Sequence, residues 1–293
     1  MTFEFTDSPY RVPFDGSFSV AAAQHGPEAP AKKSALKKSL KGEVKAIQEL
    51  QRQLYADDRW SVLMVFQAMD AAGKDGTIRA VLSGVNPAGC QVSSFKQPSS
   101  EELDHDFLWR TACRLPERGR LGVFNRSYYE EVLVARVHTG ILDNQKLPRR
   151  PEGEALWQER LESIAEHEKH LARNGTIILK FWLNVSAEEQ RQRLLARIQD
   201  PTKNWKFSGG DVKERGHWSR YMAAYEQALN ATSTPFAPWY AIPADNKPFM
   251  RLAVADILRR TLERLGLQYP TLSSAQQERL GEWESILLGE TLG

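Results

Sequence analysis

The residues best suited to chemistry lie between Val62 and Val81, where an apolar run leads into small residues and then a lysine. The run 62–66, VLMVF, has the length and composition of a buried strand. The turn after it ends in Gly73 and Lys74, and helical apolar spacing follows. This layout is typical of a phosphate-binding loop, because backbone N–H groups, a helix N-terminus and a lysine all favour an anion.

The loop departs from the usual pattern G-x-x-x-x-G-K-[ST] in ways that point to a metal ion. Ala68 stands at the first glycine position, and Asp75 stands where a magnesium-binding hydroxyl is usual. Asp70 places a carboxylate where phosphates should lie, and it would repel them unless a divalent cation came between. We therefore expect Asp70 to hold Mg²⁺ directly or through water, with Mn²⁺ as a substitute. A βα turn with a solvated lysine is the alternative. The other loop residues expected to bind phosphate or nucleotide are Ala71, Ala72, Gly73, Asp75, Gly76 and Thr77.

A second candidate group follows the strand predicted at 121–124. Asn125 stands where phosphate-loop enzymes carry an acidic residue that helps to hold magnesium, so we expect it to bind a phosphate or nucleotide and to hold the metal ion directly or through water. Arg126 follows at the carboxyl edge of the sheet, where its guanidinium can grip a transferring phosphoryl group. Tyr129 and Glu130 are also expected to bind phosphate or nucleotide. A helix cap and a surface ion pair are the alternative for the first two residues.

A basic segment between two predicted helices suggests a lid. Glycines and aromatic residues in NWKFSGGD, at 204–211, are suited to a hinged cover over the phosphate site. The cations around it are too many for the phosphates of one nucleotide and suit a longer polyanion, although a solvated helical hairpin is the alternative. Those assigned to the polyanion are Arg193, Arg197, Lys203, Lys206 and Arg215.

Helices and strands that alternate along the chain must position these groups. They predict an α/β fold, a three-layer α/β/α sandwich around a five-stranded parallel sheet. The predicted strands are 62–66, 91–95, 121–124, 176–183 and 238–243. Helices are expected from Lys32, at 100–113, from about Ala155, from Ser186 and at 248–265. We expect an irregular extension over 1–30, one domain over 31–270 with its lid at about 186–220, and a helical tail over 271–293.

The first predicted helix has one apolar and one basic face. Apolar residues recur from Leu36 to Leu54 at steps of three and four. The basic face is simply solvated, or it meets an anionic ligand or a neighbouring subunit. Its lysines are Lys33, Lys37, Lys38, Lys41 and Lys45.

Composition excludes several classes of protein. The 293 residues are 41% hydrophobic and 26% charged, which is ordinary for a globular protein. The net charge of +2 gives no reason to expect nucleic-acid binding. No run of 18 apolar residues and no signal peptide is visible, so we expect no membrane partner and a cytoplasmic location.

Four motifs together resemble the family-2 polyphosphate kinases. They are MDAAGKDGTIR at 69–79, FNRSYYEEVL at 124–133, NWKFSGGD at 204–211 and STPFAPWYAIPADNK at 233–247, and they occur in the expected order. The resemblance covers about residues 8–270. It implies a phosphate-loop kinase fold like that of thymidylate kinase, magnesium, and reversible phosphoryl transfer between inorganic polyphosphate and AMP or ADP. It also implies that Asp70, Lys74 and Arg126 are catalytic.

The resemblance bears on the acceptor and on assembly. Many family members have aspartate where this chain has Asn125, and FNRS resembles the subgroup that phosphorylates both AMP and ADP. This departure puts direct metal ligation by Asn125 in doubt. Adenine nucleotides are the expected acceptors, with guanine nucleotides as an open alternative. A homodimer or homotetramer is implied.

Three other functions remain as alternatives. A nucleoside monophosphate kinase that uses ATP as donor would share the fold but would not need so many lid cations. A GTPase switch would carry N-K-x-D, whereas residues 246–249 read NKPF. A binder of polyanions without catalysis would have no need for Asp70 beside Gly73 and Lys74.

Overall fold

Five parallel strands form one sheet, as the sequence predicts, and their order in it is β2-β3-β1-β4-β5. The computed structural model describes residues 3–29 and 31–289. In these residues no helix is long and apolar enough to cross a membrane. The strands are β1 (Ser61–Gln67), β2 (Cys90–Ser94), β3 (Leu121–Asn125), β4 (Thr176–Asn184) and β5 (Trp239–Pro243).

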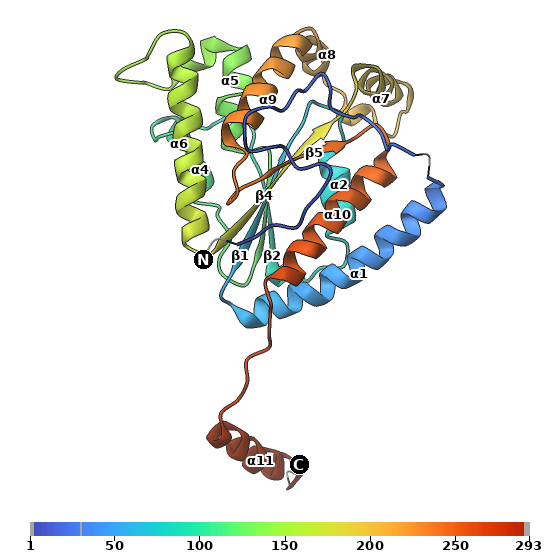
Figure 1. Ribbon diagram of the computed structural model, residues 1–293, viewed down its shortest axis with the longest axis vertical. Coiled ribbons are helices and arrows are strands. Elements are labelled where there is room, and N and C mark those ends of the chain that lie inside the picture. Colours follow the sequence, from blue (N-terminus) through green and yellow to red (C-terminus); the bar gives the residue numbers. More distant parts are fainter. Residues whose placement is uncertain (1–2, 30, 290–293) are drawn as a thin grey trace.

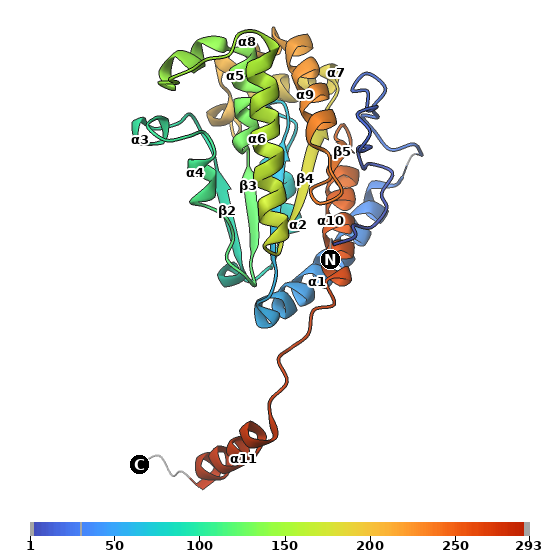
Figure 2. The ribbon, with the colours of Figure 1, turned by 60° about the vertical axis from the view of Figure 1, so that its left-hand side comes forward.

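Helices cover both faces of the sheet, which confirms the expected three layers (Figures 1 and 2). One face carries α1 (Lys33–Asp57), α2 (Lys74–Val81) and α10 (Lys247–Arg264). The other carries α6 (Glu154–Arg173) and α9 (Trp218–Thr232), with α5 (Val134–Val137) packed on α9. The apolar stripe of α1 explains its place, because Leu36, Ile47 and Leu54 are buried.

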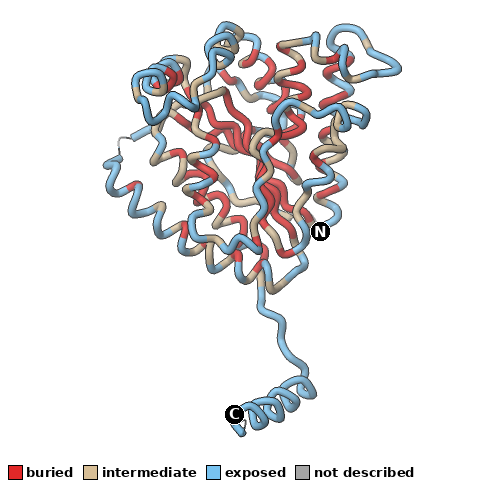
Figure 3. Tube along the Cα trace, turned by 180° about the vertical axis from the view of Figure 1, so that it is seen from behind, coloured by how far each residue is buried: buried red, intermediate tan, exposed pale blue. Residues whose placement is uncertain are grey.

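The remaining elements are short or lie at the rim. They are α3 (Ser100–Leu103), α4 (Trp109–Ala112), α7 (Ala187–Gln199), α8 (Gly209–Arg215) and α11 (Ser274–Gly289), with 3-10 turns η1 (Pro87–Gly89), η2 (Tyr128–Glu131), η3 (Thr139–Asn144) and η4 (Asn204–Lys206). In Figure 3, α11 stands away from the body and is exposed along its length.

The single helix expected over 100–113 is wrong, because the segment forms two short helices, α3 and α4. Asp106 lies between them, and its carboxylate accepts a hydrogen bond from the Leu108 N–H at 2.9 Å. Short polar side chains that bind nearby backbone in this way compete with the helical hydrogen bonds.

Residues 3–29 contain no helix and run along the outer strand of the sheet. The N–H of Val12 donates to the Trp239 carbonyl at 2.9 Å, and the Ala241 N–H donates to the Tyr10 carbonyl at 2.8 Å. A bridge at Arg11 is the one β pairing in this segment. These contacts satisfy backbone groups that an open sheet edge would expose.

A buried polar network lies below η2. Lys180 of β4 and Glu168 of α6 are both fully buried, and their charged atoms are 2.5 Å apart. Each Tyr128 and Tyr129 hydroxyl lies 2.9 Å from the same carboxylate oxygen of Glu168. Burial lowers the pKa of Lys180 and raises the pKa of Glu168, since both charges have left water. The network joins α6, β4 and η2.

Replacing Glu168 with Gln should lower the free energy of unfolding by about 3–5 kcal/mol, because it leaves a buried ammonium without its counter-charge. Urea denaturation would measure the change. The matched control is Glu166→Gln on the same helix, where an exposed pair with Lys169 is lost and a change within about 0.5 kcal/mol is expected. Equal stabilities of the two variants would contradict a buried ion pair.

Candidate functional site

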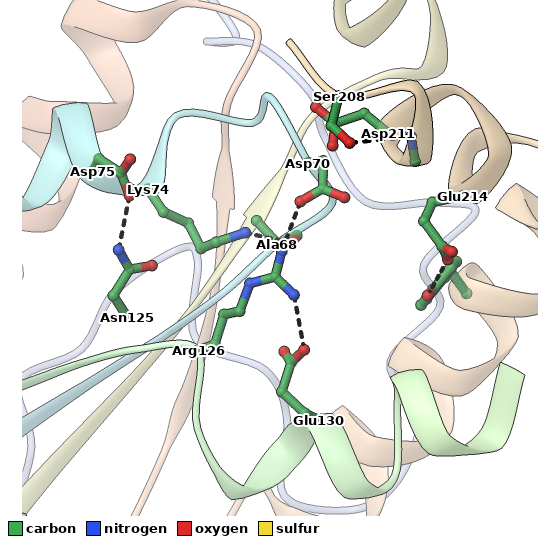
Figure 4. Close-up of polar contacts among 12 residues, drawn as sticks. Ala68, Asp70, Lys74, Asp75, Asn125, Arg126, Glu130, Ser208, Asp211 and Glu214 are labelled. Atoms are coloured by element: carbon green, nitrogen blue, oxygen red, sulfur yellow. Dashed lines mark hydrogen bonds and ion pairs between the residues drawn. The ribbon is translucent and has the colours of Figure 1, made fainter. Parts of the chain in front are cut away.

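The two candidate groups meet because the strands that carry them are neighbours. Phe66 of β1 lies opposite Asn125 of β3, and the Arg126 N–H donates to the Phe66 carbonyl at 3.1 Å. The carboxyl ends of both strands therefore open at one edge of the sheet, which is where α/β proteins bind ligands. The loop 68–73 and residues 125–130 lie face to face there (Figure 4).

The loop 68–73 turns sharply before α2. Ala71 and Gly73 have φ values of +62° and +113°. At position 73 a side chain would be strained, and its Cβ would also lie 3.2 Å from Met250. The backbone of Asp70 is fixed from α7, because the Gln190 amide donates to its carbonyl at 3.0 Å. These contacts set the loop around the N-terminus of α2.

Lys74 is buried at the first position of α2. Its Nζ donates to the Ala68 carbonyl at 2.7 Å, and this hydrogen bond joins the start of the loop 68–73 to the first residue of α2. Burial lowers the pKa of Lys74, the charge of Arg126 lowers it further, and the carboxylates of Asp70 and Glu130 oppose the shift. An anion in the loop would face an ammonium with little competing water.

Arg126 lies between two carboxylates. Its guanidinium is 2.8 Å from Asp70 and 3.0 Å from Glu130 (Figure 4). The nearby charge of Glu130 raises the pKa of Arg126, with Asp70 adding to the effect. Its φ is +65°, an uncommon value for a side chain other than glycine. The guanidinium reaches the phosphate loop at Asp70.

Asn125 and Asp75 form a second link between the two groups. The Asn125 amide donates to the Asp75 carboxylate at 2.7 Å. This bond orients the Asn125 side chain so that its amide oxygen remains an acceptor. Asn125 and Asp75 both line the main cavity.

The main cavity has a volume of about 1120 Å³ and lies between the phosphate loop and the lid. A second cavity of about 460 Å³ adjoins it and is more apolar, with Phe107, Val134 and Ile141 in its wall. Arg126 and Phe95 line both. The site thus joins a charged chamber to a smaller chamber that can cover a flat ring.

The lid consists of α7, η4 and α8. Four of its cations, Arg193, Arg197, Lys203 and Lys206, line the main cavity. Arg197 is 2.9 Å from Asp211, and Lys203 contacts Asp200. The side chain of Trp205 is 77% exposed, and the Lys206 ammonium lies 4.8 Å from the centre of its ring. These groups present cations to the cavity from its outer side.

The assignment of Arg193 and Arg215 to the polyanion disagrees with their contacts. All five N–H donors of Arg193 are used inside the protein, on the carbonyls of residues 71, 72, 244 and 245 and on Glu189. Arg215 donates to the Ala187 carbonyl and to Gln190, and it does not line the main cavity. Arg193 instead ties the phosphate loop to the start of α10.

The burial of two other residues gives no support to the roles that the sequence predicts for them. Tyr129, which the sequence assigns to the phosphate or nucleotide site, is fully buried beside Glu168 and Thr232. Thr77 was assigned to phosphate, but its hydroxyl donates to the Gly73 carbonyl at 3.0 Å and its side chain is buried. The remaining loop residues expected at the site, 70–76 without exception, line the main cavity.

The donors at the main cavity fit a magnesium ion that also binds substrate phosphates. Mg²⁺ in such sites takes one or two carboxylates and completes its shell with phosphate oxygens and water. Asp70 and Asp75 both line the cavity. In the part of the chain that the structure describes, no three His, Cys, Asp or Glu side chains gather as a metal site of their own. Any Mg²⁺ there would depend on the substrate for most of its ligands.

Sequence reasoning missed several residues of the main cavity. Lys96 and Gln97 follow β2, and Lys247 begins α10. The first two could have been found by the argument used for Asn125, because they also follow the carboxyl end of a strand. Lys247 is the last residue of the motif at 233–247, but the motif alone indicates no function for it.

Comparisons with known proteins agree with one another. Residues 30–269 match the family model described as Polyphosphate kinase 2 (PPK2). An ADP-polyphosphate phosphotransferase of Rhodopseudomonas palustris is 54% identical over 250 residues, covering 85% of this chain and 86% of the relative. An AMP/ADP-polyphosphate phosphotransferase of Meiothermus ruber is 47% identical over 232 residues, covering 79% and 83%. The crystal structure of Polyphosphate Kinase 2 from Arthrobacter aurescens TC1 matches with a TM-score of 0.85 and 37% identity, covering 96% of this chain and 99% of that chain.

Replacing Arg193 with Gln should destabilise the fold by about 3 kcal/mol, because it strips charged donors from buried carbonyls. Thermal unfolding would measure the loss. The matched control is Arg191→Gln, an exposed arginine on the same helix, which should leave the melting temperature unchanged. If the Arg193 variant kept full stability and lost only affinity for polyphosphate, Arg193 would bind the polyanion, as the sequence predicts.

Proposed function

Because the chain belongs to the polyphosphate kinase 2 family, we propose that it transfers phosphoryl groups reversibly between inorganic polyphosphate and adenine nucleotides, forming ADP from AMP and ATP from ADP. The names of its relatives support this function. The observation that carries it is the pairing of the two cavities at Arg126. A donor rich in phosphate suits the larger chamber, and a nucleoside suits the more apolar one.

The transfer is a direct in-line displacement. The bond from the terminal phosphorus of polyphosphate to its bridging oxygen breaks, and the shortened chain leaves with the electron pair. A phosphate oxygen of the nucleotide forms the new bond. That oxygen is already ionised near pH 7, so no general base is needed. The task left to the protein is to position the phosphates and to neutralise their charge.

Lys74 and Arg126 are the residues that do so. Lys74 begins α2, and Arg126 directly follows β3, so the two cations reach the phosphate loop from different elements. Their charges would lie beside the equatorial oxygens of the transferred group. Glu130 and Asp70 hold the Arg126 guanidinium in place before substrate arrives.

Asp70 is the residue proposed to hold Mg²⁺, with Asn125 contributing through water. When bound, Mg²⁺ would neutralise negative charge on the phosphates and link them to the loop. Because Asp70 also contacts Arg126 at 2.8 Å, binding of the ion would change that contact and couple metal to guanidinium. Asn125 is uncharged, so of these two residues Asp70 would supply the negative charge that binds Mg²⁺.

The runner-up, a nucleoside monophosphate kinase that uses ATP as donor, is not favoured by the relatives' names. The acceptor range is the finer question. One relative is named for ADP and the other for AMP and ADP. We propose that this chain accepts both, on the FNRS motif at 124–127, with guanine nucleotides as less favoured acceptors. A homodimer or homotetramer stays a prediction that light scattering would test.

The first test is an assay with Mg²⁺, long-chain polyphosphate and either AMP or ADP, followed by chromatography of the nucleotides. We expect AMP to yield ADP and then ATP, and chelation of the metal to stop both steps. Transfer to ADP alone would keep the family function and refute the wider acceptor range. Transfer from ATP to AMP without any from polyphosphate would replace the proposed function by the runner-up.

Lys74→Ala should abolish detectable transfer, and Arg126→Ala should raise the barrier by about 2–4 kcal/mol, since each removes a charge from the transferred group. Steady-state rates measure both effects, and circular dichroism checks the fold. The matched control is Arg79→Ala, which removes one exposed charge from the same helix and should keep the wild-type rate. Wild-type rates in the Lys74 variant would show that the loop does not hold the phosphate.

A further inference from the structure

The outer face of α1 carries a row of lysines that the proposed reaction does not use. Lys33, Lys37, Lys41 and Lys45 follow one another at steps of four, with Lys38 beside them, and all are exposed. Side chains four apart lie on one side of a helix, about 6 Å apart along its axis. Within residues 3–29 and 31–289, no carboxylate lies within ion-pair distance of any of them.

The rest of α1 explains why this row keeps its charge. Glu43 is the only acidic residue between Lys33 and Gln48. It is turned inward, where its carboxylate lies 2.5 Å from Arg259 of α10. The one acidic residue of this half of the helix therefore pairs with α10 and not with the lysines of α1. The outer face is left with lysines alone.

The row begins next to the main cavity. Figure 1 shows α1 and α10 side by side, with the starts of both at the same end of the sheet. An open cavity of about 480 Å³ lies between these two starts and is lined by Lys33 and Lys247. Lys247 also lines the main cavity. Asp245 lines the same small cavity, and its carboxylate accepts a hydrogen bond from the Ser186 N–H at 2.8 Å. Cations thus continue from the main cavity to the row.

We propose that this row, defined as Lys33, Lys37, Lys41 and Lys45, binds the part of a long polyphosphate chain that extends beyond the main cavity. The inference rests on the proposed function. From Lys33 to Lys45 the row spans about 18 Å, since each helical residue rises about 1.5 Å. Lysine is a compact charge on a flexible stem, and it suits a polyanion that slides without a fixed register. A chain of three phosphates ends inside the cavity, whereas a long chain reaches the row.

The test compares two donors in two variants. One variant replaces the four lysines of the row with Gln. The control replaces four cations on or just before α6 with Gln and so changes the net charge equally. These are Arg149, Arg150, Lys169 and Arg173. For each protein, kcat/KM is measured at fixed ADP with polyphosphate of about one hundred units and with tripolyphosphate, over a series of salt concentrations, beside the mass from light scattering.

In the row variant we expect kcat/KM for the long donor to fall at least tenfold at low salt and the preference for long over short donor to shrink by the same factor. The plot of log kcat/KM against log salt should flatten by about 3, because each lost lysine–phosphate contact removes about 0.7 from the slope on a single-stranded polyanion. The control variant should keep the wild-type preference and slope.

The outcomes separate the two claims. A row variant that keeps the wild-type preference and salt slope would overturn the inference alone. A change in mass with equal losses on both donors would overturn it too, since the row would then be a contact with a second copy or an acidic partner. Wild-type protein that transfers nothing from the long donor would overturn the proposed function and, with it, the inference.

Discussion

The guanidinium of Arg126, held between Asp70 and Glu130, is the contact on which the site depends. It joins the loop after β1 to the turn after β3, two segments that the sheet brings to one edge. A cation between two carboxylates is held in one orientation at little cost in entropy, because both partners are on short, fixed segments. The same arrangement keeps two negative charges close to a phosphate site. The repulsion between these carboxylates and a bound phosphate is reduced only when a cation, either a metal ion or a guanidinium, lies beside each carboxylate.

The position of Arg126 depends on the segment that follows it, and the buried polar network holds that segment in place. The turn η2 follows Arg126 directly, and Tyr128 and Tyr129 anchor it to Glu168. An ion pair in the core gains little stability over apolar packing, yet its groups need hydrogen-bond partners at fixed positions. Here Lys180 also donates to the Tyr129 hydroxyl and to the Thr232 carbonyl. Lys180 comes from the middle of a strand buried on both faces, where one apolar residue would pack as well. The network is thus better explained by the position it gives to η2 than by the energy it adds.

The sequence predicts the framework of this site because its cues are local. The apolar runs of the strands, the Gly73-Lys74 turn and the groups after β1 and β3 all follow from spacing within one segment, and parallel strands then bring Asp70 and Arg126 together. What it could not predict depends on distant partners. Arg193 lies 121 residues from Ala72, whose carbonyl it binds. Tyr129 sits in a motif full of site residues, and only the position of Glu168 shows that it faces the core.

The number of cations in the lid sequence therefore overstates the number of unpaired cations that a polyanion can bind there. Arg193 and Arg215 are committed to carbonyls and to α7, and Arg197 and Lys203 already contact Asp211 and Asp200. Burial raises the pKa of Asp211, and the charge of Asp70 adds to the rise. A phosphate that took Arg197 would have to displace this carboxylate, and it would gain because it carries more charge. Such an exchange would break the contact between Arg197 of α7 and Asp211 of α8.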